Sequence, residues 1–152
     1  MKISDDCINI IKQFEGFRAS PYLCSAGKPT IGYGATFYPN GKPVTLKDAP
    51  ISEPQALDML RSMASDFAKS IAAVLRRKVT QSQFDAMVSF AYNVGLGTFK
   101  TSTLLRKVNA GDTQGAANEF GKWVNATVNG KKTRLAGLVN RRNAERALFL
   151  KA

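Results

Sequence analysis

The chain of 152 residues is long enough for one domain, or for two lobes sharing a core, without a disulfide or metal framework. Its 22 basic against 11 acidic residues give a net charge of +11, which predicts an anionic partner: nucleic acid, an acidic polymer or a membrane surface. With no histidine and two cysteines, a secreted disulfide scaffold is excluded, and acid–base chemistry has to use carboxylates or a thiol. Residues 1–7 are polar and no apolar run reaches the roughly 18 residues of a membrane span, so we expect neither signal peptide nor anchor.

The chain begins with a predicted amphipathic helix, capped by Ser4 and ended by Gly16. Its apolar residues recur every three or four positions: Ile3, Cys7, Ile8, Ile11 and Phe14. Residues 17–50 differ, because β-forming residues alternate there with glycine, proline and the turn pair Asn40-Gly41. We therefore predict short strands joined by tight turns, in a sheet too thin to fold alone.

After residue 50 we predict only helices. The first opens with a capping box, Ser52 with Gln55, and its roughly twenty residues span about 30 Å, enough to connect two lobes. We interpret the basic run 76–78 as cations stabilising the end of that helix rather than as a nucleic-acid contact. Later starts and turns are expected at Thr80, Thr101 or Ser102, Asp112 and Asn129-Gly130, before a basic terminal helix.

This order of elements predicts an α+β fold in a single domain, residues 1–152. A small sheet lobe, about residues 17–50, would be joined by the long helix to a mainly helical lobe that also contains the N-terminal helix. We expect a cleft where the sheet meets the helical lobe.

Three reactive side chains, Glu15, Cys24 and Thr30, lie close together in the sequence, and we interpret their stretch as the active site. Glu15 is flanked by aromatic residues at a helix C-terminus, where burial and the helix dipole both favour the raised pKa of a general acid. The alternative is an exposed acid or an ion pair with Arg18. Thr30 begins the word Thr-Ile-Gly-Tyr-Gly, whose glycines permit close approach of another chain or a ligand.

The spacing of Glu15, Cys24 and Thr30, with eight and then five residues between them, resembles the catalytic segment of the phage lysozymes, the T4-lysozyme-like endolysins of glycoside hydrolase family 24. The likeness continues through residues 83–99, 102–112 and 137–145, so it covers essentially the whole chain. It implies a lysozyme-like fold. It also implies a muramidase that hydrolyses the β-1,4 bond between N-acetylmuramic acid and N-acetylglucosamine in peptidoglycan, lysing the host at the end of a phage cycle.

The resemblance also implies a role for each residue. Glu15 would be the general acid that protonates the glycosidic oxygen, and Thr30 would help to hold the attacking water. Cys24 stands where many relatives carry aspartate, and an ordinary thiol, with a pKa of about 8.5, is mostly neutral at pH 7. Its role stays open between base, water holder and covalent nucleophile.

Other positions carry expectations of their own. Ala35 stands where relatives commonly have a histidine, a loss that catalysis should survive. The family brings an arginine of the terminal basic motif to the catalytic glutamate, which makes Arg141 and Arg142 candidates; the alternative is a solvated helix face. A disulfide between Cys7 and Cys24 would make activity depend on reduction, but Cys7 falls on an apolar helix stripe and we expect a buried free thiol.

We expect a monomer without cofactor or metal site, whose partners are peptidoglycan, as the resemblance implies, and the anionic cell envelope, which the basic surface favours. It would wait in the host cytoplasm until a holin, which it need not contact, opens the inner membrane. A lytic transglycosylase acting on the same bond is the nearest alternative. A cationic membrane-disrupting or nucleic-acid-binding protein is the alternative from another class, motivated by the net charge and the basic residues 134–151, although no recognised nucleic-acid motif is present.

Overall fold

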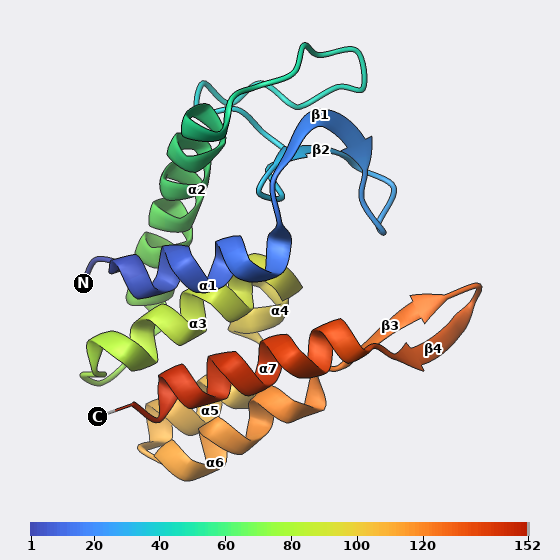
Figure 1. The fold of residues 1–152 in the computed structure, drawn as a ribbon. Helices are drawn as coiled ribbons and strands as arrows, with labels where there is room; N and C mark the ends of the chain where they lie inside the picture. Colours follow the sequence, from blue (N-terminus) through green and yellow to red (C-terminus); the bar gives the residue numbers. More distant parts are fainter. Residues whose placement is uncertain (152) are drawn as a thin grey trace.

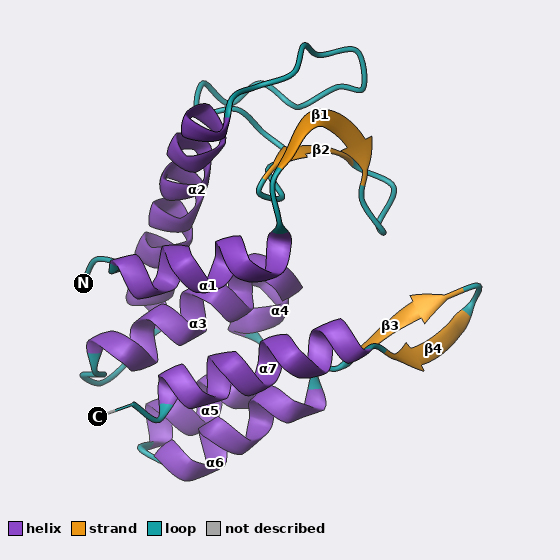
Figure 2. Cartoon of the chain, viewed as in Figure 1, coloured by secondary structure: helices purple, strands orange, loops and turns teal. Residues whose placement is uncertain are grey.

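The computed structural model describes residues 1–151 and shows two unequal lobes joined by a long helix, which confirms the α+β prediction (Figures 1 and 2). Helix α1, Asp5–Glu15, lies in the helical lobe, and the chain then enters the small lobe through the antiparallel strands β1, Arg18–Leu23, and β2, Pro29–Gly32. The connecting helix is α2, Glu53–Val74. Neither α2 nor any other helix within residues 1–151 combines the length and apolar character needed to cross a membrane.

Helix α3, Gln81–Val94, is the centre of the helical lobe. Every residue from Phe84 to Ala91 is buried, because α1, α2 and α7 all pack against this helix. The other elements of the lobe surround it: α4, Leu96–Lys100; α5, Thr103–Ala110; α6, Thr113–Glu119; the short 3-10 helix η1, Phe120–Lys122; and α7, Ala136–Phe149.

The two lobes have separate apolar cores of very different size. In the helical lobe the Phe90 ring packs edge-on against Phe120 and Trp123, with ring centroids 5.4 and 5.6 Å away. The small lobe has its own cluster, which comprises Ile31, Ala35, Val44 and Met59. The small lobe therefore depends on α2, which supplies Met59, for much of its packing.

The prediction that only helices follow residue 50 is wrong for residues 125–134. They form a hairpin of β3, Asn125–Val128, and β4, Lys131–Arg134. Its turn is the expected Asn129-Gly130, with φ of 51° and 77°, as a two-residue type I′ turn requires. The strands were missed because none of their residues is buried, so the apolar alternation that reveals a strand is absent.

Local capping signals place most helix starts correctly. The capping boxes of α2 and α3 form as predicted, and Ser102 rather than Thr101 caps α5, accepting a hydrogen bond from the Leu105 amide at 3.2 Å. Asp112 caps α6. Side-chain acceptors thus satisfy amides that would otherwise lack partners in the first turn of these four helices.

Two local expectations are met only in part. Ser4 is the N-cap residue of α1, as predicted, but its side chain makes no capping bond; its amide instead donates to the Asp85 carboxylate at 3.0 Å, which ties the start of α1 to α3. The basic run 76–78 follows α2 rather than ending it, and the last turn of α2 contains no cation. These cations are exposed between α2 and α3.

Candidate active site

Glu15 is the last residue of α1, at the point where the chain leaves the helical lobe. Gly16, with φ 71°, ends the helix and turns the chain toward β1. The Glu15 side chain is 20 % exposed. It lines a cleft of about 520 Å³ together with Phe14, Asn93, Arg141 and residues 135–138. The carboxylate therefore combines access to a ligand with a fixed position.

Arg141 of α7 fixes the Glu15 carboxylate. Its Nη1 donates to Glu15 Oε2 at 2.6 Å, and its Nη2 donates to the Ser89 carbonyl oxygen at 3.0 Å. The expected arginine is thus Arg141. The solvated-face alternative is wrong, because Arg141 and Arg142 are 3 % and 1 % exposed. Arg18 is not the partner of Glu15: its guanidinium lies over the Tyr22 ring, 4.1 Å from the centroid.

A second buried carboxylate, Glu145, holds both arginines in place. It accepts hydrogen bonds from Arg141 Nε at 3.1 Å, from Arg142 Nη1 at 2.7 Å and from Ser89 Oγ at 2.6 Å. Arg142 is anchored further by the Trp123 carbonyl oxygen, 2.8 Å from its Nε. The positive charges of the two arginines are therefore matched by the negative charges of Glu15 and Glu145. An unpaired charge would be costly in this buried region.

Gly34 and Tyr92 close the other side of the Glu15 carboxylate. A Cβ on Gly34 would lie 2.6 Å from Glu15 Oε1 and 3.6 Å from Tyr92 Cε1. Tyr92 donates its hydroxyl proton to the Tyr33 carbonyl oxygen at 2.8 Å. Burial, followed by the nearby Glu15 charge, raises the pKa of Tyr92, so it stays a donor. The absence of a side chain at Gly34 does permit a close approach to the backbone, as predicted, and the group that approaches Gly34 is the Glu15 carboxylate.

Cys24 and Thr30 meet in the small lobe, where Cys24 follows β1 and Thr30 lies buried in β2. The Cys24 amide and the Thr30 hydroxyl both donate to the Lys28 carbonyl oxygen at 2.9 Å. Partial burial raises the pKa of the Cys24 thiol, but hydrogen bonding with the Lys28 backbone and the Thr30 hydroxyl outweighs it and leaves the pKa below its ordinary value. In the structure the Thr30 hydroxyl donates its proton to the Lys28 carbonyl oxygen.

Tyr22 of β1 is influenced electrostatically by both parts of the candidate site. Burial raises the pKa of its hydroxyl first, the charge of Glu15 adds to the increase, Arg18 opposes it, and Cys24 adds a smaller increase. Tyr22 also pairs with Thr30 across the β1–β2 ladder. The structure thus brings Cys24 and Thr30 together in the small lobe, while Glu15 stands at the end of α1 and is near enough to Tyr22 for its charge to affect the Tyr22 hydroxyl.

Both cysteines are free thiols in the structure. Cys7 is completely buried on α1, as expected. Burial, followed by the charges of Asp85 and Glu145, raises the pKa of its thiol, which keeps Cys7 neutral. It precedes Glu15 by two turns of α1, about 12 Å of helix, and belongs to the helical core. The structure therefore gives a disulfide with Cys24 no support.

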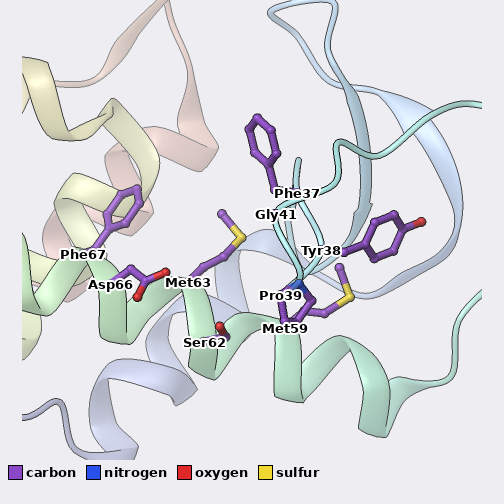
Figure 3. A pocket seen from close by; sticks show the side chains of 9 residues that line it. All are labelled: Phe37, Tyr38, Pro39, Gly41, Met59, Ser62, Met63, Asp66 and Phe67. Carbon is purple, nitrogen blue, oxygen red and sulfur yellow. The ribbon is translucent and has the colours of Figure 1, made fainter.

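A second groove, of about 280 Å³, lies between α2 and the loop that carries Phe37. Figure 3 shows Met63 and Phe67 projecting from α2 on the side where Phe37 projects from the loop. The Phe67 ring packs against Tyr92, with centroids 5.7 Å apart, and Met63 Sδ lies 4.0 Å from the Tyr92 hydroxyl. Tyr92 therefore contacts two residues that line this groove and also lies beside Gly34, next to the Glu15 carboxylate.

Sequence reasoning did not single out Tyr92, Ser89 or Glu145. Ser89 and Tyr92 are three residues apart on a helix that is otherwise mostly apolar, which is a detectable polar stripe. Glu145 follows Arg141 and Arg142 by four and three residues, the spacing of helical ion pairs. Ala35, the position at which we expected relatives to carry histidine, is buried in the core of the small lobe.

A partly exposed carboxylate fixed by a buried arginine at the end of a helix, in a helical lobe that is followed by a small antiparallel sheet, is the arrangement of a lysozyme-like enzyme. The family model described as phage lysozyme matches residues 12–145. An endolysin of Acyrthosiphon pisum secondary endosymbiont phage 1 is 43 % identical over 149 residues, 98 % of each chain. An endolysin of Bacillus phage B103 is 47 % identical over 152 residues, 99 % of this chain but only 54 % of that protein, so the chain spans about half its length.

Solved structures agree in fold. The endolysin from Escherichia coli O157:H7 phage FAHEc1 superposes with a TM-score of 0.89 at 37 % identity, over 99 % of this chain and 94 % of that one. The muramidase domain of SpmX from Asticaccaulis excentricus gives a TM-score of 0.87 at 35 % identity, over 99 % of each chain. The chain belongs to the phage lysozyme family.

Proposed function

We infer that the protein is a phage endolysin with muramidase activity, a glycoside hydrolase that cleaves the β-1,4 bond between N-acetylmuramic acid and N-acetylglucosamine in peptidoglycan. The observation that carries this inference is Glu15, a partly exposed carboxylate in a cleft, held by Arg141 at 2.6 Å. Membership of the phage lysozyme family supports the same reaction.

In this proposal Glu15 is the general acid. Its Oε2 is held by Arg141, and a Cβ on Gly34 would lie only 2.6 Å from Oε1, so the carboxyl group has little freedom to turn. A glycan strand in the cleft would displace water from the exposed part of Glu15. Glu15 then passes a proton to the glycosidic oxygen as the bond to the anomeric carbon breaks.

Cys24 and Thr30 would handle the water that attacks the anomeric carbon. The lowered pKa of Cys24 enlarges the thiolate fraction at neutral pH, and a thiolate can take the proton of that water as its oxygen bonds to carbon. When the Thr30 hydroxyl donates to Lys28, its oxygen remains free to accept a hydrogen bond from the same water. One water is consumed, and the leaving sugar receives the proton of Glu15.

Replacing Glu15 with glutamine tests the proposal. We expect Glu15→Gln to release reducing ends from purified sacculi at least about 100-fold more slowly than the unmodified protein, because the amide cannot donate the catalytic proton. Glu53→Gln, an exposed acid at the start of α2, is the matched control and should retain activity. A folded Glu15→Gln variant with unchanged activity would refute the assignment, and anhydro-muramyl ends in the products would identify a lytic transglycosylase instead.

The membrane-disrupting alternative finds little support in the terminal helix. Two of the cations in α7 are buried and ion-paired, so they cannot contact a lipid or nucleic-acid surface. A membrane-disrupting protein would release a trapped dye from protein-free anionic vesicles. We expect no such release at protein concentrations that degrade sacculi.

The proposal extends to the biological setting. We propose a monomer that accumulates in the host cytoplasm and reaches peptidoglycan only after a separate holin opens the inner membrane. Expression alone should then leave cells intact, whereas permeabilising the inner membrane should lyse them at once. Immediate lysis without permeabilisation would contradict this part of the proposal.

A further inference from the structure

The hairpin β3–β4 extends from the rim of the Glu15 cleft. Residues 135–138, which follow β4 directly, line that cleft, and the Leu135 amide donates to the Val124 carbonyl oxygen at 2.9 Å to close the base of the hairpin. Figure 1 shows the hairpin projecting away from the helical lobe, toward the same side as the small sheet. A ligand that extends beyond the cleft on this side would meet the hairpin.

The hairpin is strongly cationic, and none of the residues in its strands is buried. Residues 125–134 carry Lys131, Lys132 and Arg134 without a single acid, and these three side chains are exposed. No ion pair found within residues 1–151 involves them. An isolated two-stranded hairpin gains little stability from such a composition. Its residues are better explained by what they can bind outside the protein.

Two of the cations share one face of the hairpin. Lys132 and Arg134 are two residues apart on β4, so their side chains point to the same side, and they pair with Thr127 and Asn125 of β3. Lys132 and Asn125 also line a hollow of about 450 Å³ at the base of the hairpin, together with Trp123, Thr103 and the ion pair of Glu119 with Lys122. The carboxylate in this hollow is neutralised by its own lysine partners, whereas Lys132 and Arg134 are cations without an ion-pair partner within residues 1–151.

We propose that the hairpin binds the carboxylates of the peptide stems on the glycan strand that is cut at Glu15. The proposal rests on the muramidase function proposed above. The sugars of the strand are uncharged apart from their substituents, and its negative charge lies on the stems attached to the muramyl lactyl groups. An extended stem of four residues spans about 13 Å. The four paired positions of the hairpin cover a similar length, about 13 Å.

The predicted effect is on substrate binding and not on chemistry. The hairpin contains none of the groups placed at the reacting bond, so neutralising it should raise KM and leave kcat unchanged. Each exposed ion pair contributes little and is screened by salt, so the effect should be moderate and should shrink at high ionic strength. Exposed lysines on a free strand also discourage edge-to-edge pairing, which is a different role and predicts aggregation of the variant.

The test compares two triple variants of equal charge. Lys131→Gln with Lys132→Gln and Arg134→Gln neutralises the hairpin, and Arg76→Gln with Arg77→Gln and Lys78→Gln neutralises the exposed run between α2 and α3. Each removes three of the +11 charges, so both variants have a net charge of +8. On sacculi at low salt we expect KM to rise about 10-fold for the hairpin variant and less than about twofold for the control.

The substrate supplies the decisive comparison. On glycan strands whose stems have been removed by an amidase, we expect the hairpin variant and the unmodified protein to have the same KM. A KM difference that persists without stems, an equal effect of the control triple, or aggregation with an unchanged KM would overturn the proposal. The proposal would also be overturned if the KM difference disappeared after hydrofluoric acid treatment, which removes teichoic acids and leaves the peptide stems. If the unmodified protein releases no reducing ends at all, the muramidase function itself fails, and the two failures are thereby distinguished.

Discussion

The two lobes hold their parts of the candidate site on different kinds of support. Glu15 ends a helix of the large lobe and is bonded to Arg141, whose own partners are almost completely buried. Cys24 and Thr30 stand on a two-stranded sheet. The apolar core of that lobe has four buried residues, with Tyr38, Ile51 and Met63 packed against them. The acid is therefore held by a buried hydrogen-bond network, whereas Cys24 and Thr30, the groups proposed to handle water, belong to the lobe with the smaller core, which we expect to open more readily.

The largest effect should come from Glu145, which supports Arg141 from behind. Glu145→Gln would leave two buried arginines with one anion, at a cost of about 3–5 kcal/mol in the free energy of unfolding, measured by urea denaturation. Glu119→Gln is the control, because Glu119 is also buried but bonds Lys107 and Lys122, whose side chains are 35 % and 67 % exposed. We expect a loss of only about 1 kcal/mol there. Equal losses would contradict the view that Glu145 is special.

Cavities in the two cores should separate the stabilities of the lobes. Phe90→Ala should cost about 3–5 kcal/mol and lower amide protection in both lobes, because the ring lies on the central helix. Ile31→Ala should cost about 2–3 kcal/mol and lower protection mainly in the small lobe. Hydrogen exchange measures both. Uniform loss of protection in the Ile31 variant would show that the lobes unfold as one unit.

Gly34 tests how tightly the Glu15 carboxylate is confined. Gly34→Ala places a methyl group 2.6 Å from Glu15 Oε1 at a φ of 83°, so we expect a loss of about 2 kcal/mol and an activity reduced about 100-fold. Gly41→Ala has a similar φ, 86°, but no atom within 4 Å of the new Cβ. It should share the backbone cost and keep its activity. Full activity in the Gly34 variant would mean that the carboxylate has room to move.

Features of the fold with local sequence signals could be predicted from the sequence, whereas those that depend on distant residues could not. Helix starts at Ser52 and Thr80, and the position of Glu15 at a helix end, could be predicted because their signals are local. The partner of Glu15 could not, since Arg141 is 126 residues away and only a long-range fold brings the two together. The resemblance suggested an arginine from this region without distinguishing Arg141 from its neighbour. The hairpin at residues 125–134 was missed because it buries nothing, and burial is what leaves a pattern in a sequence.

Substitution of Cys24 should have the smallest effect on activity. It tests whether the small lobe contributes a base for water or a covalent nucleophile. If its thiolate accepts a proton from water, kcat/KM falls as pH drops through the thiol pKa, because protonation removes the base. Hydrogen bonding lowers the pKa of Cys24, so the midpoint should lie below the ordinary value of about 8.5.

Cys24→Asp should abolish that dependence between pH 6 and 9, because an aspartate is ionised throughout, and should stay within about 10-fold of the original rate at pH 7. Cys24→Ser, which cannot ionise in this range, should be slower at every pH. An inactive aspartate variant with intact folding would instead make the sulfur a covalent nucleophile, and the small lobe would then carry a reacting atom rather than a site for water.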